Sequence, residues 1–168
     1  MKNSHTILAI SGLLSAIAIV IPMFVPVITL GPAGSYTLFS HVPIMIAMFI
    51  SPAAAVYVAI GASIGFLLKA VNIVIVMRAF SHIVFAFLGA LYLSKHKNLL
   101  ASKKKTVIFG LVISVVHVVV EFAVSYVMLG MLPSLLGILA ISVLCLGFVH
   151  SMIDYTAAQF IYRIVQKK

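Results

Sequence analysis

The chain has 168 residues, of which 64% are hydrophobic and only 8% are charged. A soluble domain of this size carries about 25% charged residues, so this sequence cannot cover a surface that faces water. The formal net charge of +9 would suit nucleic acid in a soluble protein, but here the basic residues gather at the two chain ends and in one loop. That distribution is typical of one face of a membrane and predicts a lipid bilayer, not nucleic acid, as the environment.

Long apolar runs without period-2 alternation predict transmembrane helices and exclude a β-barrel. The first span is expected from Ile7 to Ile28, and a loop with glycine and proline follows over residues 29–37. The run from Leu38 to Ile50 is short for a span, because about 20 residues are needed to cross ~30 Å. Four further spans are expected over residues 52–68, 73–93, 106–132 and 133–165.

Six spans place both termini and the loop over residues 94–105 on the same side of the membrane. Nine of the eleven basic residues lie there: Lys2, Lys95, Lys97, Lys103, Lys104, Lys105, Arg163, Lys167 and Lys168. By the positive-inside rule this side is the cytoplasm. The sequence therefore predicts an all-α integral protein of the bacterial inner membrane. It forms one domain over residues 1–168, a single bundle of six transmembrane helices with both termini cytoplasmic.

Ionisable residues inside spans are costly, which makes them candidates for a functional site. At a rise of about 1.5 Å per residue, His41, Arg78 and Glu121 are expected at a similar depth in the outer half of the bundle. His82 and His117 are expected slightly deeper. We therefore predict a polar pocket beneath the outer loops. Its predicted lining residues are His41, Arg78, His82, His117, Glu121, Tyr126 and His150, with Tyr36 closing the pocket from the first loop.

Two of these assignments leave alternatives open. Arg78 and Glu121 either neutralise each other across two helices, or Arg78 anchors a ligand through its planar guanidinium fork. His150 and Asp154 lie four residues apart on one helix face, so they either satisfy each other locally or take part in the site.

The sequence carries no HExxH motif, no phosphate-cradling loop and no GxSxG nucleophile motif. The histidines are scattered along the chain, which gives no metal-ligand spacing. The sequence thus predicts no metal, no cofactor and no enzyme. Active transport by such a chain would draw on an ion gradient or on a partner.

Small residues recur four apart in two of the expected helices. Ser11 with Ser15 and Gly12 with Ala16 form two such pairs in the first span, and residues 61 and 65 are both glycine in the third. Such pairs let helix backbones approach closely in lipid. They indicate either packing inside the bundle or a docking face for another membrane subunit.

The size, the six expected spans, the small residues over 11–16 and the loop before the second span together resemble a known family. This is the substrate-binding membrane subunit (S component) of energy-coupling factor (ECF) vitamin transporters. The most specific part is residues 40–52, SHVPIMIAMFISP, which resembles the niacin branch or the neighbouring hydroxymethylpyrimidine/pyridoxine branch. Residues 78–82 (RAFSH) and 150–154 (HSMID) fit the same branches.

The resemblance implies a subunit that binds one small water-soluble vitamin from outside. It implies docking on a transmembrane coupling subunit, driven by two cytoplasmic ATPases, through the small-residue face that holds Gly12 and Ala16. Nicotinate would suit the site, with Arg78 at its carboxylate and a histidine or Glu121 near its ring nitrogen. Hydroxymethylpyrimidine or pyridoxine is the alternative ligand, and a stand-alone ion-coupled carrier is the alternative mechanism.

Overall fold

The computed structural model describes residues 4–30 and 34–166. Its α-helices are α1 (Ser4–Phe24), α2 (Val42–Met48), α3 (Pro52–Leu68), α4 (Ile73–Lys95), α5 (Lys103–Met128), α6 (Leu136–Leu139) and α7 (Leu146–Gln166). A two-stranded antiparallel hairpin, β1 (Ile28–Leu30) and β2 (Gly34–Tyr36), follows α1. Short 3₁₀ turns, η1 (Leu99–Ala101) and η2 (Pro133–Leu135), precede α5 and α6, and the π-helical segment η3 (Ala140–Cys145) joins α6 to α7.

N-cap residues in the sequence mark the start of two of these helices. Ser51 is the N-cap of α3, where its hydroxyl accepts a hydrogen bond from the Ala54 amide at 3.2 Å and Pro52 fills the first helical position. Asn72 caps α4 in the same way, accepting from the Val74 amide at 2.9 Å. Because these signals are local, the bounds predicted for the third span and for the start of the fourth agree with the structure.

The long helices are suited to lipid. Within the described residues, four helical stretches are long and apolar enough to cross a membrane: Ser4–Phe24, Ile73–Lys95, Lys103–Met128 and Pro133–Val165. α3, with 17 residues, is shorter but equally apolar. Large apolar side chains on their outer faces are exposed, among them Leu8, Phe24 and Phe160. The predicted helical fold class is therefore confirmed, apart from the short hairpin, and the helices have the length and composition of membrane spans.

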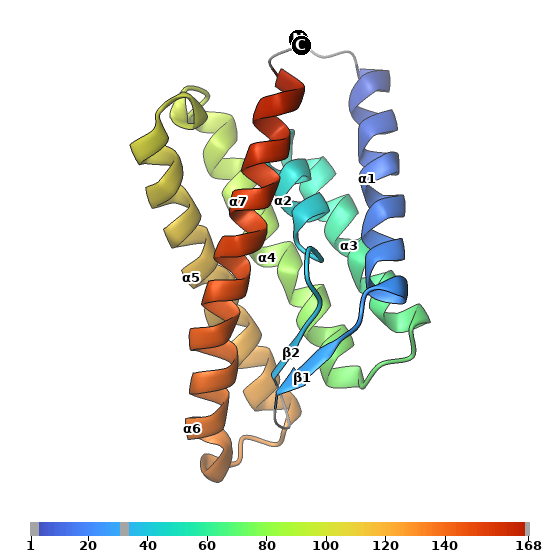
Figure 1. Cartoon of the computed structure of the whole chain (residues 1–168), viewed down its shortest axis with the longest axis vertical. Coiled ribbons are helices and arrows are strands. Elements are labelled where there is room, and N and C mark those ends of the chain that lie inside the picture. The colour runs from blue at the N-terminus through green and yellow to red at the C-terminus, as the bar shows by residue number, and fades with distance from the viewer. Residues whose placement is uncertain (1–3, 31–33, 167–168) are drawn as a thin grey trace.

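The second predicted span is not a full helix. α2 has seven residues, about 10 Å at 1.5 Å per residue, which is a third of the hydrocarbon thickness. The chain instead returns into the bundle through the hairpin, a set of turns and then α2, whose neighbours are α1, α3, α4 and α7 (Figure 1). Irregular backbone at membrane depth is tolerated when protein covers it, and six of the seven α2 residues are buried.

One end of the bundle carries the start of α1, the end of α7 and the connection between α4 and α5 (Figure 1). Lys95, Lys97, Lys103–Lys105 and Arg163 belong to that end. The other predicted members of the basic cluster, Lys2, Lys167 and Lys168, lie outside the described residues. The hairpin and the connection between α3 and α4 lie toward the opposite end (Figure 1).

The two small-residue pairs of α1 turn out to have different roles. Ser11 and Ser15 are buried, and a Cβ added to Gly61 of α3 would lie 3.1 Å from the Ser15 hydroxyl oxygen. Gly12 and Ala16 are exposed, and a Cβ on Gly12 would meet nothing within 4 Å. Of the two alternatives for these pairs, internal packing therefore holds for Ser11 and Ser15, so neither serine belongs to an exposed docking face as the docking alternative required.

Gly65 lets α3 approach the backbone of α1. A Cβ at this position would lie 2.8 Å from the Ile19 Cα and 3.0 Å from its carbonyl carbon, and the backbone cannot rotate away as a side chain can. We expect Gly65→Ala to lower the Tm of the detergent-purified protein by several degrees, because overpacking costs about 1–3 kcal/mol. Gly12→Ala is the matched control, with an unchanged or higher Tm because alanine favours helix. Equal Tm values for both variants would contradict this account of the α1–α3 contact.

Candidate functional site: a buried polar cluster under the hairpin

Four elements bring their polar side chains to one place in the interior. Arg78 and His82 come from α4, Glu121 and His117 from α5, and His150 and Asp154 from α7, each pair four residues apart on one helix face. His41 is contributed by the turn that leads into α2. All seven residues are 7% exposed or less. Such a concentration of buried ionisable groups makes this cluster the candidate functional site.

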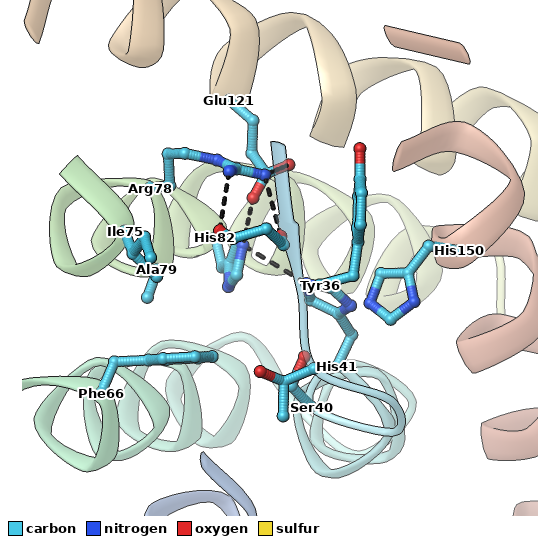
Figure 2. A pocket seen from close by; sticks show the side chains of 12 residues that line it. Tyr36, Ser40, His41, Phe66, Ile75, Arg78, Ala79, His82, Glu121 and His150 are labelled. Atoms are coloured by element: carbon cyan, nitrogen blue, oxygen red, sulfur yellow. Dashed lines mark hydrogen bonds and ion pairs between the residues drawn. The ribbon is translucent and has the colours of Figure 1, made fainter. Parts of the chain in front are cut away.

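Glu121 is the centre of the outer part of this cluster. One carboxylate oxygen, Oε2, accepts a hydrogen bond from Arg78 Nη2 at 3.1 Å, and Oε1 lies 3.1 Å from His82 Nε2 (Figure 2). The same Arg78 side chain donates to the Ser35 hydroxyl at 3.0 Å through Nη1. The guanidinium therefore joins α5 to strand β2 across the mouth of the site. The pairing of Arg78 with Glu121, one of the two alternatives, is observed. In this position the Arg78 guanidinium also lies beside β2.

Asp154 holds the backbone that enters α2. Its Oδ1 accepts from the Phe39 amide at 3.1 Å, and Oδ2 accepts from the His41 amide at 3.1 Å and lies 2.9 Å from His41 Nδ1. Phe39 has a positive φ of 64°, which is rare for a bulky residue and persists only when neighbouring contacts enforce it. The local His150–Asp154 pair is present, with His150 Nε2 3.6 Å from Oδ2, but the backbone amides and His41 Nδ1 lie closer to the carboxylate.

A small cavity lies between this cluster and an apolar wall. The wall is formed by Phe66, Ile75 and Ala79, and the polar side by Ser35, Tyr36, Thr37, Ser40, His41, Arg78, His82, Glu121 and His150 (Figure 2). Its volume of about 20 Å³ is little more than one water molecule occupies. An organic ligand therefore enters only when the covering segment, residues 35–40, moves outward.

Several polar atoms at the cavity have no hydrogen-bond partner within the described part of the chain. They are Tyr36 Oη, Thr37 Oγ1, His82 Nδ1, His150 Nε2 and both ring nitrogens of His117. Buried polar groups are normally paired, so these atoms make the cluster a candidate binding site.

Most of the predicted site residues are brought together, and one is not. His41, Arg78, His82, His117, Glu121 and His150 form the cluster, and Tyr36 covers it. Tyr126 instead lies one turn beyond Glu121, where its hydroxyl donates to the Met131 carbonyl at 2.9 Å and its ring packs near Leu139 and Val143. Its inclusion in the pocket is a wrong prediction, because α5 ends there and the tyrosine serves the turn that follows.

Sequence comparison identifies the family of this chain. The chain is 36% identical over 170 aligned positions to the niacin transporter NiaX of Lactococcus lactis subsp. cremoris (strain MG1363). The alignment covers 95% of this chain and 74% of the relative. The chain belongs to the NiaX family of ECF S components. No family model and no solved structure matches it, so the NiaX relationship is carried by sequence. As a NiaX-type transporter subunit with several apolar helices, it is a multi-pass protein of the bacterial cell membrane.

Proposed function

We propose that this protein is the niacin-binding S component of an ATP-driven ECF uptake transporter. The observation that carries the proposal is the similarity to the niacin transporter NiaX along 95% of the chain. That relationship favours niacin over hydroxymethylpyrimidine or pyridoxine as the ligand, and a transporter subunit over an enzyme. The buried polar cluster beneath the hairpin supplies a site of suitable chemistry.

Nicotinate has a negative carboxylate on a flat ring, and the cavity has a counterpart for each part. The Arg78 guanidinium offers parallel N–H donors that suit a carboxylate, and it already binds oxygen atoms of Ser35 and Glu121. Phe66 provides an apolar wall for the ring face. Tyr36 Oη and the histidine nitrogens are donors and acceptors for the ring nitrogen or a bridging water.

Entry requires that residues 35–40 move away from α4 and α7. Two of the contacts that hold this segment to α4 and α7 are the Arg78–Ser35 bond and the Asp154–Phe39 bond. Nicotinate would compete for Arg78 and thereby release the first of them. The ligand then replaces the loop contact with a contact of its own, which couples binding to the position of the loop.

The termini and the α4–α5 connection face the cytoplasm in this proposal, and the hairpin faces outside. The chain passes from one face to the other six times, counting the hairpin with α2 as the second passage. The lysines of residues 95–105 support this orientation through the positive-inside rule. The partners are a transmembrane coupling subunit and two cytoplasmic ATPase subunits.

The proposed function is tested by titrating the purified chain with nicotinate, pyridoxine and hydroxymethylpyrimidine in separate calorimetric experiments. We expect nicotinate to bind at least 100-fold more tightly than the other two. Uptake of labelled nicotinate into proteoliposomes is expected only with the coupling subunit, the ATPases and ATP present. Uptake by the chain alone, driven by an ion gradient, would instead establish a stand-alone carrier.

The exposed small-residue face of α1, defined by Gly12 and Ala16, is the proposed docking surface. We expect Gly12→Trp to prevent co-purification with the coupling subunit while nicotinate affinity stays within about twofold of wild type. A Cβ at this exposed position would meet nothing within 4 Å among the described residues, so we expect the fold to accommodate the larger side chain. Val119→Trp, on the exposed face of α5, is the control and should assemble normally. Assembly of Gly12→Trp at the wild-type level would remove α1 from the docking surface.

A further inference from the structure

Three imidazoles and one carboxylate gather around a common point at and beneath the cavity. His41, His82, His117 and Glu121 each offer one ligand atom, and these four atoms all lie within 4.8 Å of one another. They come from the turn before α2, from α4 and from α5, so no short sequence motif contains them. The prediction of no metal site rested on their separation along the sequence, but the fold brings them together in space.

Two of the distances within this set match those between ligands of one small ion. His41 Nε2 lies 3.3 Å from His82 Nε2, and His82 Nε2 lies 3.1 Å from Glu121 Oε1. Two nitrogens bound tetrahedrally to zinc at about 2.0–2.1 Å are themselves about 3.3–3.4 Å apart. His117 Nε2 lies 3.6 Å from Glu121 Oε2, close enough to join the same set with a small rotation of its ring.

Hydrogen bonding alone does not satisfy these atoms. His41 Nδ1 faces Asp154 Oδ2, an acceptor, so it carries the proton and a neutral His41 presents a lone pair at Nε2. His82 Nε2 faces both that lone pair and Glu121 Oε1, with one proton to serve the two. A cation placed between these atoms would be attracted by the lone pairs of the imidazole nitrogens and by the Glu121 carboxylate.

His117 gives a second and independent indication. Its ring is 1% exposed, and neither of its nitrogens has a hydrogen-bond partner within the described residues. Leaving a buried polar group unsatisfied costs about 1–3 kcal/mol. The Nε2 atom is aimed at the Glu121 carboxylate, where a metal bond would satisfy it.

The outer contacts are those of a metal-bound histidine. Ligating imidazoles usually donate their second N–H to a carboxylate, which fixes the tautomer and the ring orientation. Asp154 does this for His41 at 2.9 Å and is itself held by two backbone amides, of Phe39 and His41. Asp154 is fully buried, as a supporting carboxylate would be.

We propose that His41, His82, His117 and Glu121 bind one divalent ion of the zinc class, with Asp154 orienting His41. Imidazole-rich sites suit Zn²⁺ and its late first-row neighbours. With neutral imidazoles, the charged groups here are Arg78, Glu121 and Asp154, a net charge of −1. Binding of the ion changes that net charge to +1, which the carboxylate of one bound nicotinate would neutralise. This coupling rests on the proposed function, and it makes metal binding and nicotinate binding cooperative.

The test uses the full-length protein in detergent, stripped with a chelator and then titrated with Co²⁺. We expect one Co²⁺ per chain, with the intense visible absorption of a tetrahedral site, and its displacement by Zn²⁺. His82→Ala and His117→Gln should lower the affinity for Co²⁺ at least 100-fold. His96→Ala removes an exposed histidine at the cytoplasmic end and should bind as wild type does. Gel filtration and circular dichroism establish that each variant is folded, and the glutamine variant keeps the approximate size of the imidazole.

Three results would overturn the metal site: no tetrahedral spectrum, less than one-fifth of an equivalent of Zn²⁺ after gel filtration, or folded His117→Gln binding like wild type. Nicotinate titrations of stripped and Zn²⁺-loaded protein then separate the two proposals. At least tenfold tighter binding by the loaded form supports the coupling, and equal affinity overturns it. Binding of Zn²⁺ without nicotinate binding in either form would defeat the proposed function and leave the metal site standing. Nicotinate binding by a protein that takes up no metal would do the reverse.

Discussion

Replacing Arg78 by alanine is expected to lower nicotinate affinity by at least 100-fold while the protein still inserts and folds. Arg78 is 3% exposed, and it is the basic side chain that lines the cavity. Hydrogen bonds to charged groups contribute about 1.5–3 kcal/mol each, so losing a two-pronged contact with a carboxylate accounts for this factor. Titration calorimetry on detergent-purified protein measures it directly.

The substitution also leaves the Glu121 carboxylate without its cationic partner, so a lower Tm is expected as well. Arg78→Lys separates the two effects, because it keeps the charge near Glu121 and loses the planar fork. We expect this variant to regain most of the Tm and little of the affinity. Lys69→Ala is the matched control, since Lys69 binds the Val25 carbonyl at 2.7 Å, away from the pocket.

Nicotinamide provides the complementary measurement, because it has the same ring without the negative charge. Wild-type protein should prefer nicotinate strongly, and both Arg78 variants should lose most of that preference. Equal nicotinate affinity in wild type and Arg78→Ala would show that Arg78 only neutralises Glu121. That was the alternative that the sequence left open.

The depth of the polar groups could be predicted from the sequence because a straight helix has a fixed rise. Arg78 on α4 and Glu121 on α5 were placed at one level by counting residues, and they meet at 3.1 Å. The same count failed for Tyr126, where the helix ends and the chain turns. Counting residues at a fixed rise gives the depth of a side chain only within a continuous helix.

Other features depend on contacts between distant segments, and sequence periodicity does not contain them. Ser11 and Gly12 are adjacent and about 100° apart around α1, so the two residues lie on different faces of the helix. Which one faces inward is decided by Gly61 and Gly65 on α3, whose missing side chains receive Ser15 and the Ile19 backbone. The convergence of His41 with His82 and His117 likewise depends on α2 beginning inside the bundle, because His41 is the residue just before that helix.

Asp154 is the residue whose importance the sequence did not reveal, and Asp154→Asn is expected to have the second-largest effect on binding. The carboxylate accepts from two backbone amides and from His41 Nδ1 with its two oxygens. An asparagine has one oxygen, and its amide group would turn donors toward a donor. We expect a loss of about 2–4 kcal/mol in stability, since two bonds to a charged acceptor are weakened and the lower desolvation of a neutral side chain offsets part of that.

The loss should concentrate in the segment that covers the pocket. Hydrogen exchange at the Phe39 and His41 amides is expected to accelerate at least tenfold, and nicotinate affinity to fall tenfold or more. Ser151→Ala is the control on α7: it removes a buried bond to the Ser114 hydroxyl, 3.0 Å long, and touches neither amide. If Asp154→Asn lowered the Tm while exchange at both amides and nicotinate affinity stayed at wild-type values, Asp154 would be a packing residue. A selective effect would instead show that one carboxylate on α7 sets both the covering loop and the orientation of His41.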